Sequence, residues 1–337
     1  MEFFGLDIGS YNIKAVQLKK NKDKYQLVAF GSVPFTKKGI LSESESDLQE
    51  LAETIKKLCQ DVGIKTKNVA IALPQDQVFT RTVIFPSLSD EELKSALEWE
   101  AEQYIPLPLS EVFTAYEVIG KIKENGSEKI EVLLAAAPKS LVEKMIRVLK
   151  IAGLNPVSIE MEIMSIARSL ASSSNESVLV IDFGAKATDL AIVENEKIVL
   201  IHSVSIGGEA LTRAISLELG LEFNQSEAYK TSYGMDTEKL EGKVSSAIKP
   251  ILSNIVSEIA KIIHFYQEKN GNIKRIIITG GSAALPELNT FLAEKLNLEI
   301  QIGDPFSQVI KNDLAAKITS SDLPLYSVAV GLAMKEI

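Results

Sequence analysis

Three short apolar runs near the start of the chain predict β-strands separated by polar turns. FFGLDIG and IKAVQL flank the first turn, and YQLVAFGSV follows the second. Apolar runs that are bounded by turn residues are typical of strands. Leucine and isoleucine then recur at helical spacing over residues 47–62, which predicts an amphipathic helix ended by Gly63. VAIAL and VFTRTVIF predict two further strands.

The same succession of elements begins again in the second half of the chain. SVLVIDFG and ATDLAIV flank a second Asp-x-Gly turn, and IVLIHSVSI follows as a third strand. The two aspartates lie 182 − 7 = 175 residues apart. Order and spacing indicate an internal repeat, although the two units share few identical residues. Asp7, Gly9 and Lys14 thereby correspond to Asp182, Gly184 and Asp189.

A segment with a different pattern separates the two units. Ser89 and Glu92 form a capping-box pattern ahead of a predicted helix, which is followed by two predicted strands and a second helix ending at Gly153. This α-β-β-α order predicts a small inserted α+β subdomain at residues 86–156. Downstream of the second unit, helical patterns alternate with the apolar strand RIIIT, at residues 209–219, 226–232, 243–267 and 286–296.

The alternation of strands and helices predicts an α/β protein with two related lobes around a cleft. We expect residues 1–85 and 157–177 to form the first lobe, with 323–337 returning to it. Residues 178–322 would form the second lobe. A cleft between two such lobes is the natural place for a ligand.

Composition narrows the classes of function. A net charge of −9 argues against a general nucleic-acid binder, which needs an excess of lysine and arginine for phosphate backbones. Cys59 is the only cysteine, so no internal disulfide is possible and a reducing cytoplasm is expected. No apolar run approaches the roughly 18 residues that span a bilayer. We therefore expect a cytoplasmic protein that reaches a membrane only through a protein partner, without inserting directly.

The two Asp-x-Gly turns suit phosphate binding. Glycine permits close approach of a ligand, and successive backbone N–H groups in such a turn can converge on a phosphate oxygen. Ser10, Asn12 and Thr188 offer further donors, and Lys14 is a candidate phosphate cation. Asp7 and Asp182 can hold a magnesium ion through water, because Mg²⁺ loses its hydration reluctantly.

One such turn alone is usually only a hairpin, but a third element accompanies the pair. In ITGGSAALPEL, Gly280 and Gly281 follow a buried strand and leave no side chain to obstruct a flat base. The three elements in this order indicate nucleotide binding.

This order of two phosphate turns and a Gly-Gly adenosine turn resembles the actin–Hsp70–sugar kinase superfamily. The inserted segment resembles the layout of the FtsA branch, and within that branch the chain is most similar to the PilM family of type IV pilus assembly proteins. Segments that carry the resemblance extend over nearly the whole chain: GLDIGSYNIKAVQL, SALEWEAEQYIPLP, LLAAAPKSLVEKMI, GLNPVSIEMEIMSIAR, VIDFGAKATDLAIV, VSIGGEALTRAIS, SEAYKTSYG, IITGGSAALPEL and SVAVGLAM.

The resemblance implies an actin-like ATPase fold, in which duplicated ribonuclease H-like domains surround a site for ATP and Mg²⁺. Residues that match its nucleotide motifs are Gly9, Ser10, Tyr11, Asn12 and Lys14 in the first phosphate turn, Gly184, Ala185, Lys186 and Thr188 in the second, Gly280, Gly281 and Ser282 in the adenosine turn, and Gly207, Gly208, Glu227 and Lys230 around the cleft. Without the family, Glu227 and Lys230 are better explained as a solvated helix face.

Lys186 departs from the family pattern, and the role of Glu160 stays open. Lys186 stands where many relatives have glycine or a small hydroxyl residue, and it can contact a phosphate or point to water. Glu160 matches the region where hydrolytic relatives position the attacking water, but Glu162 lies close by. The resemblance therefore implies ATP binding with weak ATPase activity at most.

The family also implies a partner, the N-terminal cytoplasmic tail of a PilN-like membrane protein. Other proteins of the pilus or secretion assembly platform and its assembly ATPase are further candidates. The alternatives are an FtsA-like division protein, disfavoured because no C-terminal membrane helix is seen, and a small-molecule kinase, disfavoured because no separate catalytic aspartate stands out. Trp99 is expected either in the core of the insertion or along its groove.

Overall fold

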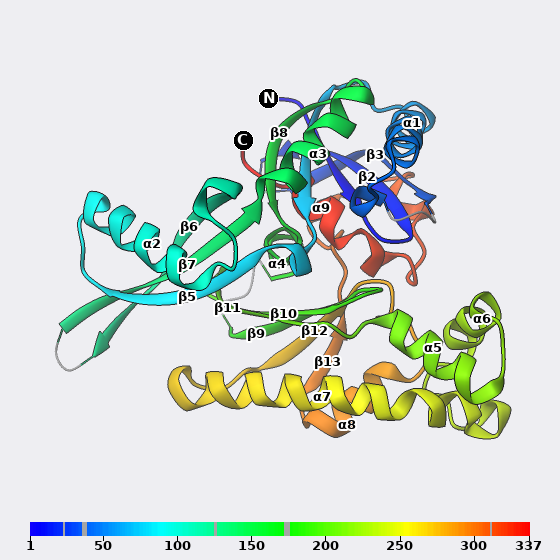
Figure 1. Cartoon of the computed structure of the whole chain (residues 1–337). Coiled ribbons are helices and arrows are strands. Elements are labelled where there is room, and N and C mark those ends of the chain that lie inside the picture. The colour runs from blue at the N-terminus through cyan, green and yellow to red at the C-terminus, as the bar shows by residue number, and fades with distance from the viewer. Residues whose placement is uncertain (23, 36–38, 125–126, 172–175, 311) are drawn as a thin grey trace.

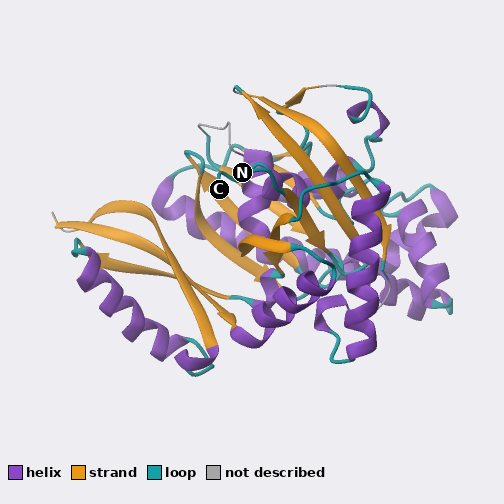
Figure 2. Cartoon of the chain, turned by 90° about the horizontal axis from the view of Figure 1, so that it is seen from above, coloured by secondary structure: helices purple, strands orange, loops and turns teal. Residues whose placement is uncertain are grey.

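The computed structural model describes residues 1–337 except 23, 36–38, 125–126, 172–175 and 311. Two lobes, each built on a mixed β-sheet, lie one above the other, and a third sheet projects to one side (Figure 1). The two termini lie close together on the first lobe in both views (Figures 1 and 2).

The first lobe contains a six-stranded sheet in the order β14-β3-β2-β1-β4-β8. Antiparallel pairing joins the first three strands in sequence, and parallel pairing adds the others on both sides. Their bounds are β1 (Phe4–Ile8), β2 (Asn12–Asn21), β3 (Lys24–Pro34), β4 (Asn68–Leu73), β8 (Asn155–Met161) and β14 (Val309–Ile310). Helices α1 (Glu45–Asp61) and α3 (Lys139–Ile151) pack their apolar sides into the core of this lobe.

The second lobe repeats the antiparallel three-strand start. Its sheet has the order β11-β10-β9-β12-β13, with β9 (Val178–Phe183), β10 (Thr188–Glu194), β11 (Lys197–Val204), β12 (Arg275–Thr279) and β13 (Glu299–Ile302). The helices of this lobe are α5 (Gly208–Leu219), α6 (Phe223–Tyr233), α7 (Lys243–Asn270) and α8 (Leu288–Leu296). All four expected helices and the strand RIIIT are therefore confirmed.

Strand register confirms the predicted internal repeat. Asp7 pairs with Lys14 across β1 and β2, and Asp182 pairs with Asp189 across β9 and β10. The two hairpins therefore present equivalent positions at the ends of equivalent strands.

The inserted subdomain begins and ends earlier than residues 86–156. Its sheet has the order β5-β7-β6, with β5 (Phe79–Pro86), β6 (Val112–Glu124) and β7 (Ser127–Pro138), and α2 (Asp90–Tyr104) lies along one face (Figure 2). β5 belongs to it because its full length pairs with β7. Helix α3 does not, because its buried residues join the core of the first lobe. The capping box of Ser89 and Glu92 is present at the start of α2.

Two helices lie between the lobes and join them. Helix α4 (Glu162–Ala171) follows β8, and α9 (Ser327–Ala333) is the returning C-terminal segment. Their apolar residues share one core cluster with β4 of the first sheet and with β9, β10 and β12 of the second. The helices cross so closely that a Cβ added at Gly331 would collide with the carbonyl of Ser165. This contact fixes the spacing of the two sheets.

Candidate functional site

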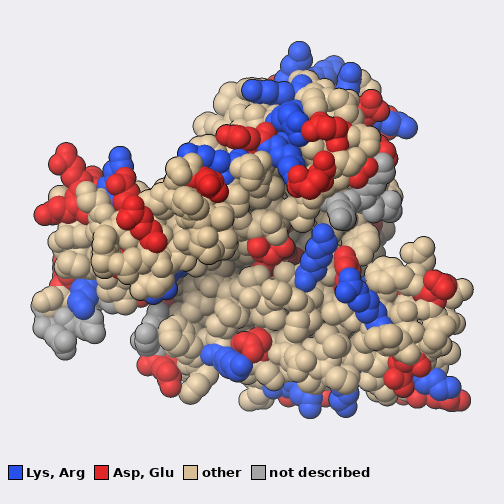
Figure 3. Space-filling model, viewed as in Figure 1, with Lys and Arg blue, Asp and Glu red and all other residues tan. Residues whose placement is uncertain are grey.

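Both Asp-x-Gly turns face one cavity of about 190 Å³ between the lobes. Figure 3 shows the surface hollowed there, with charged side chains at its edge. The predicted site residues that line it are Asp7, Gly9, Ser10, Tyr11, Asn12, Lys14, Asp182, Gly184, Ala185, Lys186, Gly280 and Gly281. The structure therefore brings together the three elements that the sequence analysis singled out, from both lobes.

The backbone of the two turns has matching geometry. The N–H of Gly9 donates to the carbonyl of Asn12 at 3.1 Å. A Cβ added at Gly9 would lie 3.0 Å from the Asn12 carbonyl oxygen, and one at Gly184 would lie 3.1 Å from that of Ala187. Each glycine is thus placed where the backbone closes tightly, and other residues of both turns line the cavity.

The first hairpin carries its own counter-ion. Lys14 Nζ donates to Asp7 Oδ2 at 2.9 Å, and both side chains are buried. Burial alone would lower the pKa of Lys14, but Asp7, together with the charges of Asp182 and Glu162, more than offsets burial, so the pKa of Lys14 is raised. Lys14 therefore stays charged in the cleft, and Asp7 neutralises it.

The second hairpin instead places two carboxyl groups side by side. Burial, together with the charges of Asp189 and Asp7, raises the pKa of Asp182 to about 7. Burial also raises the pKa of Asp189 to about 6, although Ser203 Oγ donates to its Oδ1 at 2.5 Å and opposes the shift. Protonation relieves like-charge repulsion between such groups.

Negative charge therefore dominates the cleft. Among its described lining residues, five are acidic, namely Asp7, Asp76, Glu162, Asp182 and Asp189, and two are lysines, Lys14 and Lys186. Within the described part of the chain, no three acidic, histidine or cysteine side chains converge as a preformed metal site. The donor set suits a hydrated Mg²⁺, which needs only one or two carboxylates when phosphate oxygens supply further ligands.

The Gly-Gly turn meets two different requirements. Gly280 has a φ of +87°, and an added Cβ would collide with Asp182 Oδ1 and the Phe183 carbonyl. A Cβ added at Gly281 would meet only Leu325 Cδ2, at 4.0 Å. Gly280 thus lets the turn pack against Asp182, whereas Gly281 leaves open space beside the cavity.

Several other predicted contacts lie behind the second turn rather than in the cavity lining. The N–H of Gly208 donates to the Gly184 carbonyl at 2.9 Å, and a Cβ added at Gly207 would lie 2.6 Å from the Ala185 carbonyl oxygen. Thr188 Oγ1 donates to the Ile206 carbonyl at 2.7 Å. These residues support the shape of the turn.

Lys230 supports the same turn from the helix behind it. Its Nζ donates to the Gly208 carbonyl at 3.1 Å, to Thr212 Oγ1 at 2.9 Å and to Glu227 Oε2 at 2.7 Å. These three acceptors match the three donors of an ammonium group. A Cβ added at Gly208 would lie 2.6 Å from Ser282 Oγ, which places Ser282 beside this cluster.

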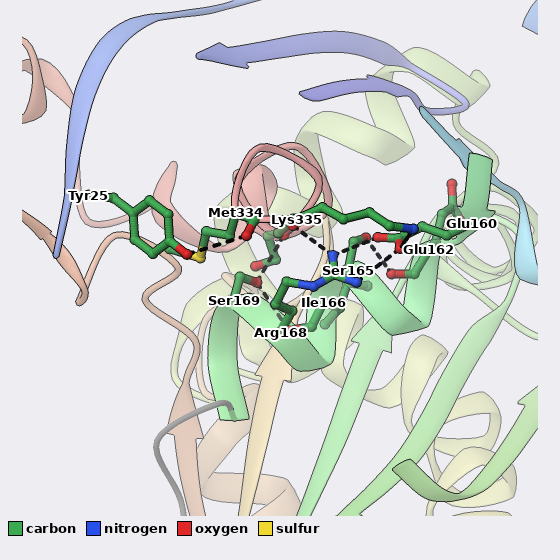
Figure 4. Close-up of polar contacts among 11 residues, drawn as sticks. Tyr25, Glu160, Glu162, Ser165, Ile166, Arg168, Ser169, Met334 and Lys335 are labelled. Atoms are coloured by element: carbon green, nitrogen blue, oxygen red, sulfur yellow. Dashed lines mark hydrogen bonds and ion pairs between the residues drawn. The ribbon is translucent and has the colours of Figure 1, made fainter. Parts of the chain in front are cut away.

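Glu160 lies outside the cavity lining, which corrects the expectation that it acts on an attacking water. Arg168 Nη1 and Nη2 donate to its two carboxylate oxygens at 2.6 and 2.9 Å, and Lys335 Nζ donates at 2.6 Å (Figure 4). Glu160 therefore joins β8 to α4 and to the C-terminal segment. The carboxyl group that does line the cavity is that of Glu162, at the start of α4.

Glu162 lies in the negative field of four other carboxyl groups of the cleft. Burial, followed by the charges of Asp7, Asp182, Asp189 and Asp76, raises the pKa of Glu162 well above its usual range. A carboxyl group so placed is a candidate proton acceptor only after cations enter the cleft.

Gln75 and Asp76, which no sequence motif singles out, also line the cavity, from the 3₁₀ turn Gln75–Gln77. Gln75 is 3% exposed, and its Oε1 has no hydrogen-bond partner among the residues that the structure describes. An unsatisfied buried acceptor costs about 1–3 kcal/mol. The available signal was a polar turn directly after a buried strand, since ligands often bind at the carboxyl ends of parallel strands.

Trp99 lies neither in the core nor along the groove of the insertion. It is 59% exposed on α2. The groove of the insertion, about 310 Å³, is lined by Lys94, Leu97, Glu98, Ala101, Leu109, Thr114, Tyr116 and Leu134, and Trp99 is not among its lining residues.

Comparison with known proteins gives one family match and several structural likenesses. The model of the family described as type IV pilus assembly protein PilM matches residues 5–337. The cell division protein FtsA of Enterococcus hirae is 21% identical over 360 residues, which cover 94% of this chain and 81% of that protein. FtsA of Streptococcus pneumoniae is 23% identical, over 94% of this chain and 79% of that protein.

Solved structures agree with the family match. A structure of the PilM–PilN type IV pilus biogenesis complex is similar with a TM-score of 0.84 and 26% identity, covering 99% of this chain and 98% of that one. MreB5 of Spiroplasma citri bound to AMPPNP is similar with a TM-score of 0.52 and 16% identity, covering 98% and 94%. The chain therefore has the actin-like ATPase fold. No helix in the described residues is both long and apolar enough to cross a membrane.

Substituting Asp182→Asn should flatten the pH dependence of stability in nucleotide-free protein. The folded pKa of about 7 exceeds the unfolded value of 3.8, so this group's contribution to the free energy of unfolding is full below pH 3.8 and is lost as pH rises through about 7. The Tm of the wild type should fall by several degrees between pH 5.5 and 8.5, and the Tm of the variant should fall by less. Parallel Tm curves would contradict the assignment; the exposed Asp90→Asn is the control.

The two neighbouring glutamates should respond to amide substitution in opposite directions. Glu160→Gln leaves the partly exposed Arg168 and Lys335 around a neutral group, so Tm should fall by several degrees. Glu162→Gln removes a carboxyl group that its neighbours repel, so Tm should hold or rise at pH 8. Thermal unfolding of both variants tests this, and a Tm loss of equal size in each would refute the placement.

Proposed function

The chain belongs to the PilM family of type IV pilus assembly proteins, and on that premise we propose that it binds ATP with Mg²⁺ in the cleft and acts as a cytoplasmic scaffold of the assembly platform. The observation that carries the proposal is the convergence of two equivalent turns from separate lobes on one cavity. Such an arrangement suits a polyphosphate held from both sides.

Charge supports a nucleotide that arrives with a metal ion. A free triphosphate would meet the five carboxyl groups of the cleft, and like charges at these distances repel strongly where water is excluded. Asp7 and Asp182 would hold Mg²⁺ through water, as its slow loss of hydration requires. Lys14 and the exposed Lys186 would contact phosphate oxygens, and the metal ion would supply the remaining positive charge.

The dimensions of the cleft imply that the lobes move apart when nucleotide enters. Its volume of about 190 Å³ is below the roughly 300–1,000 Å³ of typical small-molecule pockets. Tyr11 Oη donates to Glu209 Oε1 at 3.1 Å and so joins the first turn to α5 of the other lobe. Burial and the Glu209 charge raise the pKa of Tyr11 to about 12. Opening would break this bond, and nucleotide contacts to both lobes would replace it.

The cleft favours binding over rapid hydrolysis. Glu162 is the carboxyl group placed to accept a proton from water, but burial and its acidic neighbours raise the pKa of Glu162 well above its usual range. A carboxyl group that holds its proton cannot act as a general base until cations lower its pKa, and the triphosphate that arrives with them brings negative charge into the same cleft. We therefore expect weak ATPase activity at most.

The proposed partner is the N-terminal cytoplasmic tail of a PilN-like membrane protein. The chain is similar at a TM-score of 0.84 to the protein solved as a PilM–PilN complex. Such a tail would hold the scaffold at the inner membrane, with other platform proteins and the assembly ATPase nearby. Peptide tails bind comparable proteins as added strands or in apolar grooves.

The effect of Asp182→Ala on ATP affinity should depend on whether Mg²⁺ is present. With Mg²⁺ we expect micromolar-class affinity by calorimetry, weakened at least tenfold in Asp182→Ala because the metal-bridging carboxylate is lost. Without Mg²⁺ the variant should bind ATP at least as well as wild type, because one repelling charge is removed. Glu218→Ala, an exposed change on α5, is the control. Equal affinities of wild type and Asp182→Ala in Mg²⁺ would sink the proposed site.

A peptide with the sequence of the PilN-like tail should bind the full chain, and a scrambled peptide should not. Fluorescence anisotropy of the labelled peptide, with and without Mg·ATP, measures this directly. Absence of binding in both conditions would contradict the proposed partner while leaving the nucleotide site intact.

A further inference from the structure

The 3₁₀ turn Gln75–Gln77 joins the first lobe to the inserted sheet, and two of its residues line the cleft. It follows β4, and β5 begins two residues after it, at Phe79. Gln75 lines the cavity, is 3% exposed, and its Oε1 accepts no hydrogen bond from any described residue. A buried polar atom without a partner, in a residue that lines a cavity, points to a donor that enters the cavity with a ligand.

The missing group must be a hydrogen-bond donor. An amide carbonyl only accepts, and so do ionised carboxylates such as Asp7 and Asp182 in the same lining. Among the donors of the described lining, Lys14 is bonded to Asp7, and neither Lys186, Ser10 nor Asn12 donates to Gln75 Oε1. Phosphate oxygens are acceptors as well. Water molecules that a divalent cation retains are donors, and Mg²⁺ usually keeps several of them.

We propose that Gln75 Oε1 accepts a hydrogen bond from a water molecule in the shell of the divalent cation bound with nucleotide, and that this bond links occupancy of the cleft to the inserted sheet. The proposal rests on the proposed nucleotide function. It assigns Gln75 as a binding residue, and it makes the turn a connection between ligand and subdomain.

The turn is built to transmit a displacement of Gln75. Buried Leu73 and Val78 anchor its two sides in the core of the first lobe. The Gln77 N–H donates to the Pro74 carbonyl at 3.0 Å, and the Val78 N–H donates to the Gln75 carbonyl at 3.2 Å. No free linker therefore separates the cavity from β5, whose pairing with β7 runs from Phe79 to Pro86.

The test compares Gln75→Leu with Gln77→Leu in the full chain. Gln77 lies in the same turn but donates to Asp76 and is absent from the cavity lining. If Gln75 serves a ligand, leucine removes an unsatisfied acceptor, so the nucleotide-free Tm should hold or rise. If Gln75 instead only stabilises the fold, the Tm of Gln75→Leu should fall.

Calorimetry supplies the second readout. Gln75→Leu should weaken Mg·ATP binding about tenfold, as loss of one hydrogen bond to a charged group implies, and leave ATP binding in EDTA unchanged. Gln77→Leu should bind as wild type in both. Unchanged Mg·ATP affinity, or equal weakening with and without metal, would overturn the proposal.

Hydrogen exchange read by mass spectrometry tests the link to the inserted sheet. Saturating Mg·ATP should change exchange of the β5 amides in wild type and in Gln77→Leu, and the change should be absent in Gln75→Leu. The same β5 change in saturated Gln75→Leu would contradict the link. Failure of wild type to bind Mg·ATP at all would instead refute the underlying nucleotide function.

Discussion

The close crossing of α4 and α9 between the two sheets is the constraint on which the cleft depends. Because Gly331 has no side chain, the backbone of α9 lies directly against the Ser165 carbonyl of α4. Apolar residues from both sheets pack around the two helices. Ser169 Oγ donates to the Ser327 carbonyl at 2.9 Å, and Thr279, at the end of β12, bonds to the Pro324 carbonyl at 2.8 Å. The connecting helices thereby place two hairpins from different sheets face to face.

Once the hairpins face each other, their charges determine what the cleft can hold. Lys14 balances Asp7 in the first hairpin, whereas the equivalent position in the second is Asp189, beside Asp182. The duplicated geometry therefore carries an asymmetric charge. This excess of carboxyl groups, together with their burial, raises the pKa values of Asp182, Asp189 and Glu162. Bound cations or protons are therefore needed to offset the negative charge of the cleft.

Features that depend on short stretches of chain could be predicted from the sequence. The hairpin register, the helices and the membership of both turns in one cleft follow from local apolar patterns and an internal repeat. Features that depend on tertiary packing could not. Only the folded β8–α4 junction shows that Glu160, and not Glu162, pairs with Arg168. Likewise, only the packing of α5 against α6 shows that Lys230 donates its hydrogen bonds to acceptors on these two helices. Gln75 stands out only in the folded chain, where its buried Oε1 has no hydrogen-bond partner among the described residues.

A structure of the full chain with Mg²⁺ and a non-hydrolysable ATP analogue tests the central claim most directly. The account predicts phosphate oxygens about 2.7–3.2 Å from backbone N–H groups of both Asp-x-Gly turns, with the metal ion between Asp7 and Asp182. A nucleotide that contacts the turn of one lobe alone, or that binds outside the cleft, would contradict it.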